Sequence, residues 1–198
     1  MTYLLMVLSW GLFYSLHSAL AASKLKRILK AKWPSAYKWY RLFYAVLSTL
    51  LFMGIIIQAL VMPVKEVFFP SKFGQYAGYM IATGGVMIFL KSIKEISMKS
   101  FLGLRPNEQF EEEPKLVTTG MYTQVRHPLY LGMLFIFIGF FLVSGTVGAL
   151  IHLICLLVYL PLGIYFEEKN LIAQFGESYL EYQKEVPAFF PKIHKKRA

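Results

Sequence analysis

The sequence predicts an all-α integral membrane protein with five transmembrane helices. Of its 198 residues, 57% are hydrophobic and 17% aromatic, and the mean hydropathy is +0.51. Charged residues make up only 16% of the chain, against about 25% in a typical soluble domain. The charges stand in blocks between uncharged runs, and a helix of about 20 such residues crosses the hydrocarbon core of a bilayer. Closed β-barrels also span membranes, but their strands alternate polar and apolar residues, and these runs do not.

Four uncharged runs define the predicted helices in chain order: residues 1–23, 42–64, 73–90 and 128–166. Each of the first three is long enough for one span. The fourth is long enough for two, with a turn at SGTVG, residues 144–148. We therefore predict one membrane domain over residues 1–198. It comprises a three-helix part (1–90), a cytoplasmic loop (91–127), and the helical hairpin with a C-terminal segment (128–198).

The first run has a second interpretation, because residues 18–23 read SALAAS and resemble a signal-peptide cleavage site. No positive charge precedes the run, however, and seven Lys and Arg residues follow it before Leu42. This arrangement favours a retained helix with its N-terminus outside over a cleaved signal.

The distribution of Lys and Arg orients the predicted helices, since cytoplasmic loops carry the excess of positive charge. With five spans, 19 of these residues fall on one side and 2 on the other. We therefore expect an integral protein of the cell (inner) membrane. Its N-terminus would lie on the outer side of that membrane and its C-terminus in the cytoplasm. The net charge of +10 also suits anionic headgroups. Membrane lipids are thus expected partners. Nucleic acid is not, because no platform of basic and aromatic residues is visible.

Charged groups stand at both ends of the predicted hairpin. Arg126 and His127 come directly before its first helix, and Glu167 and Glu168 end its second. Because the two helices are antiparallel, these ends lie on one membrane face and their side chains become neighbours. Pro128 suits the first turn of a helix, where its missing N–H costs nothing. Ionisable groups that face inward at a membrane boundary are candidates for function, although each alone could simply reach out to the interface.

The residues after Glu168 predict an amphipathic helix that lies along the membrane surface or caps the cavity. Its apolar and aromatic positions are Leu171, Phe175, Tyr179 and Tyr182, at spacings of four, four and three.

Other polar residues are weaker candidates. His17 and Ser18 could form a helix–helix hydrogen bond or contact a substrate, and His152 has a structural interpretation. Cys155 is the single cysteine, so no intrachain disulfide forms. Arg105 is a candidate for binding a cofactor or an acceptor. No metal is expected, since neither CxxC nor HExxH occurs.

Two segments together resemble a known family. Residues 120–133 read GMYTQVRHPLYLGM, and residues 166–191 read FEEKNLIAQFGESYLEYQKEVPAFFP. They resemble the membrane methyltransferases that include isoprenylcysteine carboxyl methyltransferase and the phospholipid N-methyltransferases. The N-terminal part, with FYSLHSALAASKLK, YRLFY and FLGLRP, is similar to the bacterial branch that includes methanethiol S-methyltransferase and the NnrU-like proteins.

The resemblance implies an enzyme that uses S-adenosylmethionine, bound between the last two spans and the C-terminal segment near the cytoplasmic face. By motif position, the cofactor-binding residues would be His127, Tyr130, Gly132, Glu167, Glu168, Leu171, Tyr179 and Tyr182. The acceptor would contact Arg105, Tyr122 and Arg126, and the catalytic residues would be Arg126 and His127.

The chemistry leaves the acceptor open. Methyl transfer from a sulfonium needs two aligned reactants in a dry site more than it needs an acid. His127 could be a general base for a thiol or an amine, or a residue that orients its neighbours. Arg126 could stabilise a thiolate or pair with a carboxylate. The acceptor is therefore a small thiol or a lipophilic molecule methylated on sulfur, oxygen or nitrogen.

Two further interpretations compete with a methyltransferase. One is a non-catalytic, NnrU-like accessory protein that keeps the scaffold. The other is a sterol-reductase-like enzyme, but such enzymes have more spans and bind a nicotinamide cofactor. The presence of both the RHP-x-Y motif and the paired glutamates favours catalysis, because a scaffold without activity need not keep both ends of the site.

Overall fold

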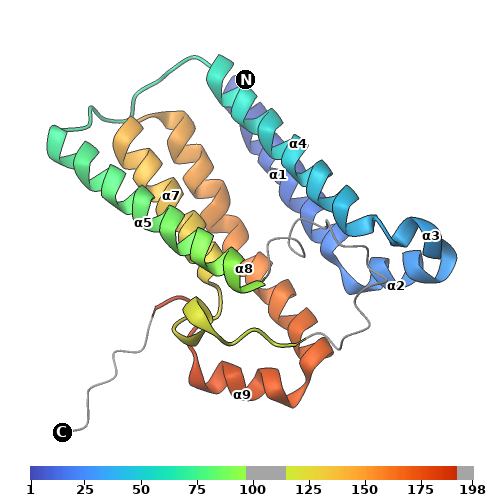
Figure 1. Cartoon of the computed structure of the whole chain (residues 1–198). Coiled ribbons are helices and arrows are strands. Elements are labelled where there is room, and N and C mark those ends of the chain that lie inside the picture. The colour runs from blue at the N-terminus through green and yellow to red at the C-terminus, as the bar shows by residue number, and fades with distance from the viewer. Residues whose placement is uncertain (97–114, 191–198) are drawn as a thin grey trace, which may run out of the picture.

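The computed structural model describes residues 1–96 and 115–190, and all its regular elements within those ranges are helices (Figure 1). The predicted all-α class is thus confirmed. Extended backbone pairs only at an isolated bridge between Glu66 and Thr146 in this part of the chain. The elements are α1 (Thr2–Ala21), α2 (Ser23–Lys32), α3 (Pro34–Tyr37), α4 (Tyr40–Val61), α5 (Lys72–Ile96), the 3-10 helix η2 (Gly120–Thr123), α7 (Pro128–Ser144), α8 (Val147–Phe175) and α9 (Glu177–Glu185).

Four of the described helices are long and apolar enough to cross a membrane: α1, α4, α5 and α8. Large hydrophobic side chains on them point outward, such as Leu50, Met80 and Val158, as suits a surface that faces lipid. The fifth predicted span, α7, has 17 residues and is shorter than these four. Pro128 begins it and Gly145 ends it, with φ +63 in the left-handed region. The predicted count of five spans is therefore not confirmed, and length and composition support four.

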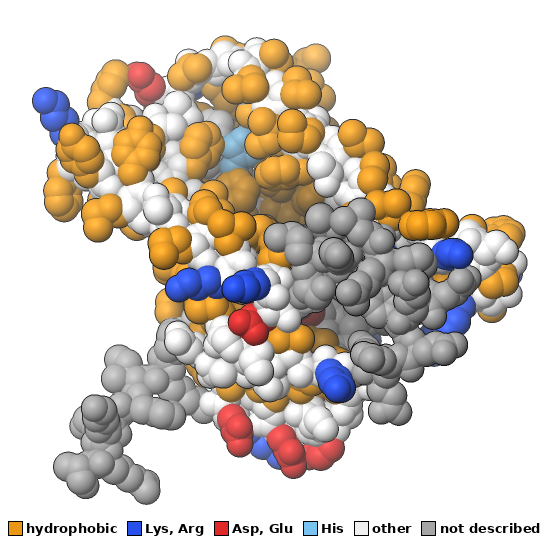
Figure 2. All heavy atoms as spheres, in the orientation of Figure 1, with side chains coloured by type: hydrophobic (Ala, Val, Ile, Leu, Met, Phe, Trp, Pro, Cys, Tyr) orange, Lys and Arg blue, Asp and Glu red, His pale blue; other side chains and the backbone are white. Residues whose placement is uncertain are grey.

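The helices pack in the order α5, α7, α8, α1 and α4, so that α4 and α5 are neighbours in sequence but lie at opposite edges (Figure 1). The N-terminus lies at one end of the bundle, and α2 and α9 lie at the other. In Figure 2, hydrophobic side chains cover most of the half that holds the N-terminus, whereas most charged side chains on this face lie in the other half.

Glycines bring α5 and α7 into backbone contact. A Cβ added to Gly85 would lie 2.7 Å from the carbonyl oxygen of Gly132, and one added to Gly139 would lie 2.5 Å from the carbonyl oxygen of Gly78. Real Cβ atoms do not approach so closely, so each position must be glycine for the helices to pack this way. Gly132 thus permits close helix approach, as expected, and its partner is α5.

The turn between α7 and α8 comprises Gly145 and Thr146 and lies within the predicted residues 144–148. The Thr146 hydroxyl accepts a hydrogen bond from the N–H of Ala149 at 3.3 Å and so caps α8. The loop before α5 lies against this turn, because the N–H of Val147 donates to the carbonyl of Lys65 at 2.8 Å.

The prediction of one continuous amphipathic helix from Leu171 to Tyr182 is wrong. α8 continues through the paired glutamates to Phe175, and Gly176 then adopts φ +57 and ψ −128. Glycine reaches this region at low cost because it lacks a Cβ. The chain turns there, and α9 lies beneath the end of the bundle as a separate helix (Figure 1).

Candidate active site

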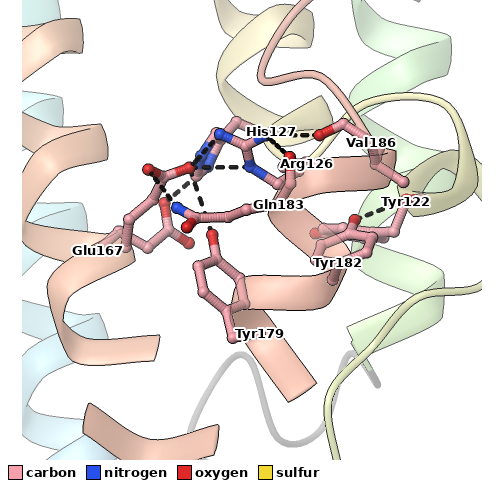
Figure 3. Close-up of polar contacts among 9 residues, drawn as sticks. Tyr122, Arg126, His127, Glu167, Tyr179, Tyr182, Gln183 and Val186 are labelled. Atoms are coloured by element: carbon pink, nitrogen blue, oxygen red, sulfur yellow. Dashed lines mark hydrogen bonds and ion pairs between the residues drawn. The ribbon is translucent and has the colours of Figure 1, made fainter. Parts of the chain in front are cut away.

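The predicted site residues meet where α7 begins and α8 passes the end of the bundle. The extended residues after α9 lie against the segment before α7. The N–H of Arg126 donates to the carbonyl of Pro187 at 2.9 Å, and the N–H of His127 donates to that of Ala188 at 3.2 Å. Both ends of the α7–α8 hairpin and the C-terminal segment therefore form one polar cluster (Figure 3).

Glu168 lies at the centre of this cluster. Its Oε1 accepts hydrogen bonds from Arg126 Nε at 2.9 Å and Nη2 at 2.7 Å, and from the Tyr179 hydroxyl at 3.4 Å. Its Oε2 accepts one from Gln183 Nε2 at 2.9 Å. Both oxygens of Glu168 are thus occupied by donors from this protein.

Arg126 completes the connection to α9. Its Nη1 donates to the backbone carbonyls of Gln183, at 3.2 Å, and Val186. The side chains of Arg126 and Glu168 are only 12% and 18% exposed, so water screens their ion pair weakly. We call this arrangement the Arg126–Glu168 clamp; it ties the start of α7, the end of α8 and α9 together.

His127 lies between the two glutamates. Its Nδ1 is 3.2 Å from Glu167 Oε2, and its Nε2 is 3.0 Å from Glu168 Oε1. Ionised carboxylates only accept hydrogen bonds, whereas a neutral imidazole carries one N–H; two carboxylate partners therefore select the imidazolium. Burial alone would lower the pKa of His127, but hydrogen bonds and charge from Glu167 and Glu168 outweigh it, and the pKa is raised. Of the two predicted roles, this geometry favours orientation over general-base catalysis.

We expect a pH-dependent contribution of His127 to stability. Because its pKa is raised on folding, the contribution is complete below the ordinary value of about 6.5 and is lost as the pH rises through the raised value. His127→Gln should therefore lower the thermal unfolding midpoint in detergent most at acid pH, and the difference from wild type should shrink as the pH rises. A difference that stays constant from about pH 5.5 to pH 9 would contradict a doubly paired imidazolium.

Glu167 has a different environment from Glu168. Its side chain is 45% exposed, and tyrosines from five elements interact electrostatically with it. They are Tyr44 on α4, Tyr122 in η2, Tyr130 and Tyr159 on α7 and α8, and Tyr179 on α9. A half-exposed carboxylate among aromatic rings offers a binding site for a cation.

Tyr182 links α9 to the loop before α7. Its hydroxyl donates to the backbone carbonyl of Tyr122 at 2.6 Å. Burial raises the pKa of Tyr182 to about 12, against a lowering effect from Arg126, so the hydroxyl stays a donor at neutral pH. An open cavity of about 320 Å³ adjoins the cluster at Glu168 and is lined by Tyr165, Glu168, Lys169 and Ile172.

Most of the predicted site residues come together, and their roles stay predictions. The cluster contains Tyr122, Arg126, His127, Glu167, Tyr179 and Tyr182 (Figure 3). Glu168 and Tyr130 belong to it through their interactions with Arg126 and Glu167. Leu171 is half-buried on α8, one turn beyond Glu167. Gly132 packs against Gly85 on α5 and is not part of the Arg126–Glu168 clamp. Arg105 lies outside the described residues.

Sequence reasoning missed Gln183, Tyr44 and Tyr159. Gln183 stands four residues after Tyr179, the spacing of one helix face, which was a usable signal. Tyr44 and Tyr159 lie inside apolar runs, where nothing in the local pattern distinguishes them from core aromatic residues.

The model of the family described as "Phospholipid methyltransferase" matches residues 73–178, a segment that includes both ends of the hairpin. The chain belongs to the phospholipid methyltransferase family. It is accordingly a membrane methyltransferase, as the sequence motifs predict.

Several relatives of this methyltransferase carry assigned activities. A methanethiol S-methyltransferase of Crocosphaera subtropica is 30% identical over 94% of this chain and 73% of its own. Another from a Pseudomonas species is 30% identical over 91% of this chain and 70% of its own. A protein-S-isoprenylcysteine O-methyltransferase of Mus musculus is 33% identical over 65% of this chain and 47% of its own. No solved structure gave a significant match.

Proposed function

We propose that this methyltransferase transfers the methyl group of S-adenosylmethionine to a small thiol at the cytoplasmic face of the cell membrane. The observation that carries the proposal is the contrast between the two glutamates. Glu168 is occupied by donors of the protein, whereas Glu167 is half-exposed among tyrosines. Such a carboxylate suits a ligand with positively charged groups.

The residues present fit S-adenosylmethionine, which supplies an electrophilic methyl group when bound. Glu167 would accept hydrogen bonds from its ammonium or ribose hydroxyls, and the surrounding tyrosine rings would face its sulfonium. Arg126, His127 and Glu168 then act as positioning residues that hold α9 over the site. The two glutamates predicted as cofactor ligands thus receive different roles.

The relatives favour a thiol among the possible acceptors. Two matches named methanethiol S-methyltransferase extend over 94% and 91% of this chain, and two others extend over 39% and 38%. The match to the mouse isoprenylcysteine enzyme extends over 65%. A small apolar thiol also reaches a membrane site through the bilayer, and a lipophilic carboxylate or amine is the second choice of acceptor.

The placement at the cytoplasmic face rests on the positive charges. Lys30 and Lys32 end α2, which lies at the same end of the bundle as the site (Figure 1). Cytoplasmic segments carry such an excess, and the N-terminus, at the opposite end of the bundle, would then lie outside.

We expect the purified protein in detergent to bind S-adenosylhomocysteine, measured by calorimetry. Glu167→Gln should weaken binding by about tenfold to a hundredfold, because a hydrogen bond to a charged group contributes about 1.5–3 kcal/mol. Glu177→Gln is the matched control, since Glu177 is 71% exposed on α9. Methanethiol added with S-adenosylmethionine should yield dimethyl sulfide, detected by gas chromatography. A folded, monodisperse protein that binds no S-adenosylhomocysteine would exclude the proposal and favour an accessory role.

A further inference from the structure

A thiol loses a proton when it is methylated, and the motif histidine is poorly placed to take it. Both ring nitrogens of His127 face carboxylates, so the imidazolium offers no lone pair. A second histidine, His17 on α1, lies outside residues 73–178 that match the family model. The inference below rests on the proposed thiol methyltransferase activity and concerns where that proton goes.

His17 belongs to a set of polar side chains between α1, α4 and α8. The Tyr44 hydroxyl lies 2.7 Å from its Nε2 and 3.0 Å from its Nδ1, and the Ser48 hydroxyl lies 3.3 Å from Nδ1. The Ser18 hydroxyl lies 3.0 Å from that of Tyr159, and the Tyr159 ring stacks on Tyr14 with centroids 4.0 Å apart. We call Tyr14, His17, Ser18, Tyr44, Ser48 and Tyr159 the tyrosine–histidine tract.

The tract continues to the candidate active site. Tyr44 and Tyr159 interact electrostatically with each other and with Glu167. On α8, Tyr159 and Glu167 are eight residues apart, which is about 12 Å along the helix. Gly163 stands between them on the same face, and a Cβ there would lie 3.0 Å from the Tyr159 ring. The missing side chain lets this ring lie along α8 toward Glu167.

His17 differs from His127 in the partners of its ring. Its hydrogen bonds in the described structure go to hydroxyl groups, which can both donate and accept. A neutral imidazole satisfies them: Nδ1 donates to Ser48, and Nε2 accepts from Tyr44. The charged groups that act on Tyr44 are Arg41 and Glu167. The described hydrogen bonds of the imidazole itself go to the hydroxyls of Tyr44 and Ser48 and not to a carboxylate. Its Nε2 lone pair is therefore available to a proton that arrives through the Tyr44 hydroxyl.

A purely structural role in helix–helix hydrogen bonding would explain part of this tract. Trp10 and His152 show such a bond, in which Trp10 Nε1 donates to His152 Nδ1 at 2.8 Å. Such bonds do not explain Tyr14. Its hydroxyl is the buried side-chain polar atom without a hydrogen-bond partner in the described ranges. Leaving such a group unsatisfied costs about 1–3 kcal/mol. A ligand with a polar atom bound beside Tyr14 would remove that cost.

We infer that the tyrosine–histidine tract binds the thiol acceptor and that His17 takes its proton through the Tyr44 hydroxyl. The S–H proton passes to the Tyr44 oxygen as the Tyr44 proton passes to His17 Nε2. The thiolate lone pair forms the new S–CH3 bond, and the bond between the methyl carbon and the sulfonium breaks with its electron pair left on the departing sulfur. The products are a methyl thioether, neutral S-adenosylhomocysteine and a proton on His17, which is released to solvent.

The test compares acceptors that differ in acidity. The variants His17→Gln and Tyr44→Phe are assayed with an alkyl thiol and with an aryl thiol that is already ionised at the assay pH. We expect kcat for the alkyl thiol to fall about a hundredfold or more, the usual scale of lost general-base catalysis. The loss for the ionised thiol should stay below about tenfold, because no proton remains to be removed. S-adenosylhomocysteine should bind both variants as it binds wild type.

Tyr3→Phe is the matched control. Tyr3 is also on α1, but its hydroxyl donates a hydrogen bond to the backbone carbonyl of Pro63, at the end of α1 opposite to His17. This variant should leave both activities unchanged. Equal losses for the two thiols would make the tract a structural element and overturn the inference, as would a wild type that binds S-adenosylhomocysteine but methylates no thiol. Absence of S-adenosylhomocysteine binding in wild type would instead overturn the proposed function.

Discussion

Glu168→Ala is expected to abolish S-adenosylhomocysteine binding and to release α9 from the bundle. The substitution leaves the Arg126 guanidinium, the His127 imidazolium and the Gln183 amide without the carboxylate that they share. Removing one partner of a buried ion pair costs about 3–5 kcal/mol, and partial exposure reduces this to about 2–3 kcal/mol. Calorimetry with S-adenosylhomocysteine and limited proteolysis after Lys184 measure the two effects.

Glu177→Ala serves as the control for this variant. Glu177 lies on α9 as well, but it is 71% exposed and its partner Lys184 is 4.0 Å away. Surface pairs of this kind contribute about 0–1 kcal/mol, so binding and proteolysis should match wild type. Unchanged binding in Glu168→Ala would show that the clamp does not position the site.

Gly85→Ala is expected to destabilise the protein strongly, although it adds only one methyl group. The added Cβ would lie 2.7 Å from the carbonyl oxygen of Gly132 and 2.8 Å from the backbone nitrogen of Ile136. Backbone atoms cannot move aside as a flexible side chain can, so α5 and α7 must separate. Overpacking typically costs about 1–3 kcal/mol. The unfolding free energy in detergent should fall accordingly, and binding of S-adenosylhomocysteine should weaken because α7 carries Arg126 and His127 at its start.

The neighbouring Gly84→Ala is the matched control. A Cβ at Gly84 meets no atom within 4 Å. Alanine is about 1 kcal/mol better than glycine inside a helix, so this variant should be as stable as wild type or slightly more stable. Equal destabilisation by the two substitutions would contradict the role of backbone contact between α5 and α7.

Local sequence signals predicted the elements well where a single physical effect dominates. Uncharged runs located α1, α4, α5 and α8, and the charges beside Pro128 and Phe166 located the polar cluster. Pattern did not reveal that Gly176 divides α8 from α9, because the spacing of Phe175, Tyr179 and Tyr182 is helical on both sides of it. Positive φ at one residue changes the direction of the chain without changing the periodicity.

The division of labour between Glu167 and Glu168 could not be predicted from sequence. Adjacent residues on a helix point about 100° apart, so one turns toward Arg126 and Gln183 and the other toward the tyrosines. Which one faces which group depends on the packing of α7 and α9 around α8. The contacts of His17 and Tyr44 are equally non-local, since they join α1 and α4 across unrelated parts of the chain.

The length of α8 relates the site to the lipids around it. Its 29 residues extend about 43 Å, against about 30 Å of hydrocarbon in a typical bilayer. The part of α8 that exceeds the hydrocarbon thickness corresponds to its last residues, from Glu167 to Phe175. At the other end, the turn at Thr146 pairs with a loop that carries Lys65 and Glu66, so α8 cannot slide freely along the membrane normal. A thicker bilayer would draw the glutamates toward hydrocarbon, where charge is costly. The acyl-chain length of the host membrane therefore sets how deeply the site is immersed.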